Sequence, residues 1–551
     1  MKNLSLIFDG ICCRGCYFEI ESELKQISGI KNIHLDFDNK ACDIHFDDYV
    51  VSYKKIIDII NRTSHKVKDY ELKSFKKSYK NQKYNFDIII IGGGTAAFSA
   101  AIKANELGLT NAMINDGLPI GGTCVNVGCI PSKYLIRLAE YIDKINHNRF
   151  PNFIEQKITN FKINFDKIID HKKDVVSYMR KIKYEDIIKN LNKTTLIKGY
   201  AKFLDKNTVI VDDQKITAKY IIIATGSSPN IPLIKGLEDI NYYTNDTLFD
   251  LEELPERLVI IGGGYIGLEI AQAYKRFGSD VFLIESTNRL LPHLTEDISN
   301  NIQYYLKKEG IHIYTNVHIN EIIKQGKNII LKGSDVQIQG THLMIAIGRK
   351  PNTNQLGLEQ INIHTLPTGH IIVNDYLQTN IENIYAVGDC NNLPAFVYTA
   401  AYEGGLAVQN IDACCEKGQQ KIDYKSLPWV IFTEPQIAGC GYTEKSLIEN
   451  NIKYEKIILP IREIPRFAVS FERRGFVKIL RNPNNDTFLG AEIIAPDAGE
   501  LIMLISLAIK YNISVSEFSS NLFPYLTAVE GLKLASLTFK KDISKLSCCA
   551  F

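Results

Sequence analysis

Cys124 and Cys129 have the spacing in this chain that most directly indicates redox chemistry, because the intervening Val-Asn-Val-Gly lets a helical turn bring both sulfurs within bonding distance. A second pair closes the chain, in the segment Cys548-Cys549-Ala550-Phe551. Adjacent cysteines bridge each other only with strain, but two thiolates on a terminal tail can hold a soft metal ion or exchange with another thiol pair. The alternative for this second pair is a frayed tail without function. Two thiol pairs together predict a transfer from one to the other.

A third cysteine cluster, Cys12-Cys13-Arg-Gly-Cys16, lies in a separate N-terminal module. Apolar periodicity predicts the order βαββαβ, a ferredoxin-like pattern, with strands at 3–9, 33–37, 42–46 and 67–72 and helices at 17–27 and 53–61. Two sulfurs before a helix lie near its positive end, which favours thiolates and a soft cation of low coordination number.

This module resembles the heavy-metal-associated domain, in which Cys13 and Cys16 are the expected metal ligands. Cys12 departs from that signature and is either a third ligand or incidental. A thioredoxin-like redox motif is the alternative for Cys-x-x-Cys, but the βαββαβ order argues against it.

Composition limits the classes of protein to which this chain can belong. The chain has 551 residues, 45% of them hydrophobic and 23% charged, which is typical of a multidomain soluble protein. A net charge of +2 gives no reason to expect nucleic acid or a membrane as a partner. The start, Met1 to Ile11, is too short and too polar for a secretory signal. We therefore expect a cytoplasmic protein whose twelve cysteines are mostly reduced.

The body of the chain carries two glycine-rich turns, each between an apolar strand and a helix. In such a turn the first glycine permits the bend, the second lets the backbone approach a pyrophosphate, and a third small residue allows close helix packing. An acid after the next strand can bond a ribose hydroxyl. The first copy consists of Gly92, Gly94, Ala97 and Asp116, and the second consists of Gly262, Gly264, Gly267 and Glu285. Two complete copies predict two Rossmann-like, dinucleotide-binding α/β domains.

From about Asn85 to its end, the chain resembles the flavoprotein disulfide reductases. The segment Gly121-Gly-Thr-Cys124-Val-Asn-Val-Gly-Cys129-Ile-Pro-Ser-Lys133 matches their redox-active segment in type and spacing. The resemblance implies FAD as cofactor, exchange with substrate at Cys124, and a charge-transfer contact of Cys129 with the flavin. It also implies that Lys133 lies near the flavin and pairs with Glu269, and that Tyr265 covers the ring. Further expected cofactor-binding residues are Gly122, Thr123, Thr225, Gly226, Gly348 and Asp389.

The resemblance also divides the chain into domains. These are a heavy-metal-associated domain at 1–71, a linker at 72–84, a first FAD-binding part at 85–235, an NAD(P)-binding domain at 236–352, a second FAD-binding part at 353–425, and an α+β dimerisation domain at 426–551.

We expect NADPH as the pyridine nucleotide, with NADH as the possible alternative, because two features of the chain conflict. Glu285 should bond a free ribose diol and repel a 2′-phosphate, which favours NADH. Arg289 is close in sequence and could offset that repulsion, and the subfamily that the chain resembles generally uses NADPH.

One substitution bears on the substrate. Disulfide reductases of organic dithiols end in His-Pro-Thr-x-x-Glu, whose histidine shuttles protons across the dimer interface. Here the aligned segment is Phe523-Pro-Tyr525-Leu-Thr-Ala-Val-Glu530. A phenol of ordinary pKa near 10 is a poor base at neutral pH, so dithiol exchange is badly supported. Tyr525 either orients or helps to release a metal thiolate, or it only packs in the dimer interface.

The N-terminal metal-binding module, the tyrosine at position 525 and the terminal pair Cys548-Cys549 together resemble the mercuric reductases, a branch of the same family. The resemblance implies a homodimer in which Cys548 and Cys549 of one subunit take Hg(II) from small thiols and pass it to Cys124 and Cys129 of the other, where two electrons reduce it to Hg(0). Two alternatives remain: a dihydrolipoamide dehydrogenase-like enzyme with a metal-binding appendage, and a protein that only sequesters metal.

Overall fold

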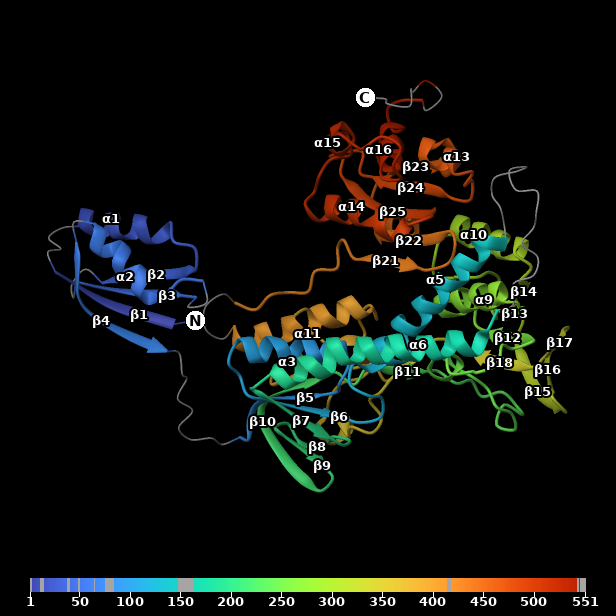
Figure 1. The fold of residues 1–551 in the computed structure, drawn as a ribbon, viewed down its shortest axis with the longest axis horizontal. Helices are drawn as coiled ribbons and strands as arrows, with labels where there is room; N and C mark the ends of the chain where they lie inside the picture. The colour runs from blue at the N-terminus through green and yellow to red at the C-terminus, as the bar shows by residue number, and fades with distance from the viewer. Residues whose placement is uncertain are drawn as a thin grey trace. The chain divides into compact units, whose positions relative to one another are not determined.

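The computed structural model describes residues 2–9, 14–36, 40–47, 50–63, 65–74, 84–146, 163–413, 418–542 and 545. The chain forms two compact units, Met1–Lys83 and Tyr84–Phe551, which are coloured along the chain in Figure 1.

The N-terminal unit has the element order predicted from its apolar periodicity. Its elements are β1 (Lys2–Asp9), α1 (Arg14–Lys25), β2 (Ile30–Asp36), β3 (Ala41–Phe46), α2 (Tyr53–Arg62) and β4 (Lys66–Ser74). The antiparallel sheet has the strand order β2-β3-β1-β4. Leu4, Leu6 and Ile44 of the sheet are buried with Ile20 and Ile56 of the helices. Strand β4 extends three residues past the predicted domain end at residue 71.

The larger unit begins with a mostly parallel sheet of order β7-β6-β5-β10-β9-β8. Strand β20 also pairs with β10, in parallel, on the edge of β10 that faces away from β5. The strands are β5 (Phe86–Ile91), β6 (Asn111–Asn115), β7 (Thr194–Lys198), β8 (Lys202–Asp205), β9 (Thr208–Val211), β10 (Gln214–Ile223) and β20 (Ile384–Ala386). Four consecutive buried isoleucines, Ile88 to Ile91, form the centre of β5. Such an unbroken apolar run is typical of a parallel strand covered on both faces.

Two helices far apart in sequence, α3 (Thr95–Glu106) and α11 (Val397–Asp412), lie side by side over this sheet (Figure 1). Gly404 permits their close approach, because a Cβ there would lie 2.2 Å from the carbonyl oxygen of Ala96. The domain is therefore assembled from two separate stretches of the chain.

The inserted second domain repeats the same arrangement around a parallel sheet of order β14-β13-β12-β18. Its parallel strands are β12 (Arg257–Ile261), β13 (Asp280–Ile284), β14 (His312–Tyr314) and β18 (His342–Ile345). Helix α9 (Tyr265–Phe277) follows β12, and a small antiparallel sheet of β15 (Ile319–Gln325), β16 (Asn328–Gly333) and β17 (Gln337–Gly340) completes the domain.

The C-terminal part is an antiparallel five-stranded sheet of order β21-β22-β25-β24-β23. Its strands are β21 (Pro428–Ile431), β22 (Gln436–Gly441), β23 (Glu455–Pro460), β24 (Phe476–Arg481) and β25 (Phe488–Ala495). Three helices of this part are α14 (Ala498–Lys510), α15 (Val515–Ser520) and α16 (Glu530–Leu537). Among the described residues, no helix combines the length and the apolar character that a membrane crossing requires.

Candidate active site

The first glycine of each fingerprint occupies a backbone position that only glycine fits. Gly92 has φ +134°, and a Cβ on it would lie 2.2 Å from the carbonyl oxygen of Ala224. Gly262 has φ +119°, and a Cβ on it would lie 2.3 Å from the carbonyl oxygen of Ala346. Both positions combine the left-handed backbone region with a contact to a neighbouring strand end. The two turns therefore adopt the same geometry from sequences 170 residues apart.

The helices that follow these turns begin without a side-chain cap. Gly94 is the N-cap of α3 and Gly264 is the N-cap of α9, and neither position supplies a capping hydrogen bond. The first N–H groups of each helix therefore keep their capacity to bind an anion, assisted by the helix dipole. A Cβ on Gly264 would meet no atom within 4 Å, so there is open space at this helix end. Gly267 lies against Gly262, since a Cβ there would be 2.0 Å from its carbonyl oxygen. Ala97 of α3 is fully buried.

The structure places Asn115, rather than the predicted Asp116, beside the first glycine turn. A Cβ on Gly93 would lie 2.4 Å from the Asn115 side chain, whereas Asp116 is exposed and accepts a hydrogen bond from the N–H of Gly117 at 2.7 Å. Strand β6 ends at Asn115, so Asp116 is the first residue after the strand, as predicted, but its side chain is directed away from the turn. Strand pairing could have identified the position, since Ile91 pairs with Ile114 as Ile261 pairs with Ile284.

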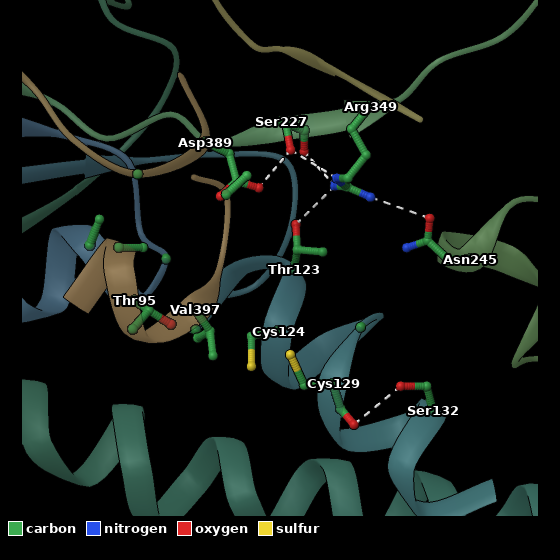
Figure 2. A pocket seen from close by; sticks show the side chains of 18 of the residues that line it. Thr95, Thr123, Cys124, Cys129, Ser132, Ser227, Asn245, Arg349, Asp389 and Val397 are labelled. Atoms are coloured by element: carbon green, nitrogen blue, oxygen red, sulfur yellow. Dashed lines mark hydrogen bonds between the residues drawn. The ribbon is translucent and has the colours of Figure 1, made fainter. Parts of the chain in front are cut away.

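Cys124 and Cys129 belong to two successive helices, α4 (Gly122–Asn126) and α5 (Cys129–Asn146). Figure 2 shows their sulfur atoms facing one another, and no disulfide joins them. Gly128 permits the sharp turn between the helices, because a Cβ there would lie 2.9 Å from the carbonyl oxygen of Thr123. Asn126 fixes the preceding turn by donating to the carbonyl oxygens of Pro119 at 2.9 Å and Gly122 at 2.8 Å. The sulfur pair is therefore held by ordered local structure.

Lys133, one helical turn beyond Cys129, forms the ion pair with Glu269 that the resemblance implies. Its Nζ lies 2.7 Å from Glu269 Oε2 and 4.6 Å from the ring centroid of Phe432. Glu269 is buried, and its Oε1 accepts the N–H of Phe432 at 2.9 Å. This pair joins α5, α9 and the C-terminal part directly beside the cysteines.

A chain of hydrogen bonds links Asp389 and Thr123 through Ser227 and Arg349, near the two cysteines (Figure 2). Ser227 Oγ donates to Asp389 Oδ2 at 2.8 Å, and Arg349 Nε donates to Ser227 Oγ at 2.8 Å. The Arg349 guanidinium also donates to Thr123 Oγ1 at 3.5 Å and to Asn245 Oδ1 at 3.3 Å. No role was predicted for Ser227, Asn245 or Arg349, because the hydrogen bonds that join them link residues more than 100 positions apart.

These groups surround one cavity of about 260 Å³. Residues that line it from the predicted site are Gly94, Thr123, Cys124, Cys129, Lys133, Gly226, Glu269 and Asp389. The cavity thus unites the uncapped end of α3, the cysteine pair, the Lys133–Glu269 ion pair and the Asp389 carboxylate in one space.

Family models match this chain over both of its main parts. Residues 86–404 match the model described as pyridine nucleotide-disulphide oxidoreductase, and residues 427–536 match the dimerisation domain of the same family. The chain belongs to the pyridine nucleotide-disulphide oxidoreductases. Members of this family use FAD and a pyridine nucleotide, and the dimerisation domain indicates a homodimer.

Curated relatives within the family match the chain over its full length. A protein named mercuric reductase from Lysinibacillus sphaericus is 38% identical and covers 100% of both chains. Another with this name, from Staphylococcus aureus, is 36% identical and covers 98% of both chains. Among solved structures, the HOCl-induced flavoprotein disulfide reductase RclA from Escherichia coli has a TM-score of 0.73 at 27% identity, covering 83% of this chain and 100% of that chain.

The cavity residues fit the FAD that the family uses. Gly94 and Gly122 touch so closely that a Cβ on Gly122 would lie 2.8 Å from the Gly94 Cα, which leaves backbone N–H groups to face a pyrophosphate. Gly226 and Gly348 have φ values of +67° and +108° with open space where a Cβ would stand. Thr225, next to Gly226, is held through its carbonyl oxygen by Asn352 Nδ2 at 3.0 Å. Asp389 presents its carboxylate toward the same cavity.

Several residues predicted to belong to the site do not line this cavity. Tyr265 stacks on Trp429, with 6.5 Å between ring centroids and 14° between ring planes. Tyr525 is 53% exposed in the segment between α15 and α16. Glu530 begins α16 and is buried, and within the described part of the chain its Oε2 has no hydrogen-bond partner. Cys16 lies in the first turn of α1. The other cysteines named from the sequence, Cys12, Cys13, Cys548 and Cys549, lie outside the described residues.

The electrostatics of the site distinguish the two thiols. The hydrogen bond from Cys124 and the charge of Lys133 lower the pKa of Cys129 to about 7, against the opposing effect of burial. The same hydrogen bond, together with burial, raises the pKa of Cys124. Cys129 is therefore the thiolate of the reduced pair near neutral pH, and its place at the N-terminus of α5 supports this assignment.

The Lys133–Glu269 pair provides a test of this assignment, because its two members act on the Cys129 pKa in opposite directions. Lys133→Met should raise that pKa and Glu269→Gln should lower it, each by about one pH unit. The measurement is the pH midpoint for alkylation of Cys129 in the reduced protein, read by peptide mass spectrometry. The double variant should fall between the two single variants. A shift of both single variants in the same direction would contradict the assignment.

Proposed function

We propose that the chain is an NAD(P)H-dependent mercury(II) reductase. The observation that carries this proposal is the facing pair Cys124 and Cys129 in a cavity that adjoins the Lys133–Glu269 ion pair. Support comes from full-length relatives named mercuric reductase and from Tyr525, which stands where organic dithiol reductases have their proton-shuttling histidine.

The chemistry follows from the softness of both partners. Hg(II) prefers soft, polarizable thiolates, and linear coordination by Cys124 and Cys129 satisfies it without a bare ion in solution. Bound FAD would supply the two-electron transfer from the reduced nucleotide to the thiolate-bound Hg(II). The net reaction is Hg(II) + NAD(P)H → Hg(0) + NAD(P)⁺ + H⁺, and Cys124 and Cys129 stay thiolates throughout. The hydrogen bond from Cys124 and the charge of Lys133 lower the pKa of Cys129, which raises the fraction of this sulfur that binds the metal ion without first losing a proton.

Delivery of the ion involves the terminal cysteine pair and the two cysteines of the N-terminal unit. Cys548 and Cys549 of one subunit receive Hg(II) from small thiols and pass it, sulfur by sulfur, to Cys124 and Cys129 of the partner subunit. Cys13 and Cys16 of the N-terminal unit bind the same ion and hold a local store of it. Tyr525 orients the metal thiolate at the interface, and Glu530 lies near it in sequence.

The deciding experiment measures elemental mercury. The purified holoprotein is given Hg(II) at excess thiol with NADH or NADPH, because Glu285 and the resemblance point to different nucleotides. Mercury vapour should form in a one-to-one ratio with oxidised nucleotide. Cu(II) serves as a comparison acceptor, because a Cu(II) complex of the similar RclA has been solved. A protein that only sequesters metal would oxidise no nucleotide.

Lipoamide is the second acceptor in this assay, and it tests the dihydrolipoamide dehydrogenase-like alternative. We expect little turnover, since Tyr525 is a weak base at neutral pH. Lipoamide turnover without vapour would refute the proposal. Joint replacement of Cys548 and Cys549 by alanine should slow Hg(II) reduction and leave flavin reduction by the nucleotide unchanged, because the tail acts only in delivery.

A further inference from the structure

Glu285 occupies the position in the second nucleotide-binding turn that decides which ribose can bind. It follows β13 directly, and the pairing of Ile261 with Ile284 places it beside the turn that begins at Gly262. In the first turn the equivalent pairing, Ile91 with Ile114, leads to the neutral Asn115. The two turns thus share one backbone geometry and differ in charge at the ribose position.

The Glu285 carboxylate is buried and fixed by the backbone around it. Its Oε2 accepts the N–H of Gly263 at 2.8 Å, and its Oε1 accepts the N–H of Thr287 at 2.8 Å. The exposed Ser286 hydroxyl donates to Oε1 at the longer distance of 3.2 Å. A carboxylate has about four acceptor sites, so two are available to ribose hydroxyls once Ser286 turns to solvent.

Arg289 is the one basic residue in the segment 285–290, and its guanidinium is engaged elsewhere. Its Nη2 donates to the carbonyl oxygens of Pro292 at 3.2 Å and Leu294 at 3.1 Å. Its Nε is buried without a hydrogen-bond partner in the described part of the chain. These bonds direct the Arg289 side chain to the following loop and away from a role as a phosphate ligand.

We infer that Glu285 makes NADH the electron donor and excludes NADPH. This inference extends the proposed reductase by naming its nucleotide. A free adenosine ribose offers two hydroxyl donors to the available sites of the Glu285 carboxylate. A 2′-phosphate would place a second negative charge against this buried, backbone-held carboxylate, and the Arg289 guanidinium donates to the carbonyl oxygens of Pro292 and Leu294 instead of compensating for it.

The test is a binding measurement that needs neither mercury nor turnover. Dissociation constants of NAD⁺ and NADP⁺ for the oxidised holoprotein are determined by titration calorimetry at one ionic strength. We expect NAD⁺ to bind about 100-fold more tightly. Because Hg(II) is absent, failure of the proposed mercury reduction would leave this result standing, and the reverse also holds. Equal or tighter binding of NADP⁺ would overturn the inference.

Two variants separate the roles of Glu285 and Arg289. Glu285→Gln keeps the side-chain shape and removes the charge, so the preference for NAD⁺ should fall below about 10-fold. Arg289→Met should leave that preference unchanged, whereas a selective loss of NADP⁺ binding would show that Arg289 is a phosphate ligand and overturn the inference. Bound flavin and circular dichroism report folding in both variants. Should Glu285→Gln fail to fold, the wild type and Arg289→Met still decide the outcome.

Discussion

Replacement of Cys124 by serine is expected to abolish Hg(II)-dependent oxidation of the reduced nucleotide, with a loss of about 1,000-fold or more. A hydroxyl is not ionised at neutral pH, and its hard oxygen is a poor ligand for a soft ion. Cys129→Ser should have an effect of the same size, because two facing thiolates are needed to hold the ion. Mercury vapour and nucleotide oxidation are measured together under saturating substrate.

The two cysteine variants should remain folded and yellow, because Cys124 and Cys129 are only half-buried. Cys440→Ala is the matched control: this cysteine is 2% exposed in β22, and burial raises its pKa to about 12. The control should keep full turnover. Retention of more than a tenth of the wild-type rate in Cys124→Ser would show that reduction does not occur at this pair.

Replacement of the two fingerprint glycines by alanine is expected to remove two different functions. In Gly92→Ala the Cβ would lie 2.2 Å from the Ala224 carbonyl oxygen, so the first turn must shift and flavin binding should be lost. In Gly262→Ala the Cβ would lie 2.3 Å from the Ala346 carbonyl oxygen, so the second turn must shift. The protein should keep its flavin and stay yellow, but the nucleotide should no longer reduce that flavin. Each substitution should also destabilise its domain by about 3 kcal/mol.

Flavin content, reduction by NADH or NADPH, and reduction by dithionite distinguish these outcomes. Gly326→Ala is the control, because Gly326 also has a positive φ, +62°, but open space where a Cβ would stand. It should cost about 1 kcal/mol from backbone strain alone and leave both cofactors bound. Wild-type flavin reduction by a nucleotide in Gly262→Ala would contradict the assignment of the second turn.

Features that depend on neighbouring residues could be predicted from the sequence. The glycine turns, the spacing of Cys124 and Cys129, and the βαββαβ order follow from local sterics and from apolar periodicity over a few turns. The pairing of Lys133 with Glu269, 136 residues apart, came from the family resemblance, because no local pattern links them. Asn115, and not Asp116, lies against Gly93, because a shift of one position along a strand end changes which side chain faces the turn.

The sequence by itself determined two glycine turns between a strand and a helix, the spacing of Cys124 and Cys129, and the family. Only the tertiary structure decided the direction of particular side chains. Arg289 is close to Glu285 in sequence, yet its guanidinium donates hydrogen bonds to the carbonyl oxygens of Pro292 and Leu294. Ser227 and Arg349 join Asp389 to the site only because strands β11 (Ser227–Pro229) and β19 (Arg349–Pro351) pair. Such contacts form only where the packing of the chain brings a donor and an acceptor within about 3 Å of each other. The order of residues along the chain does not show which pairs will come that close.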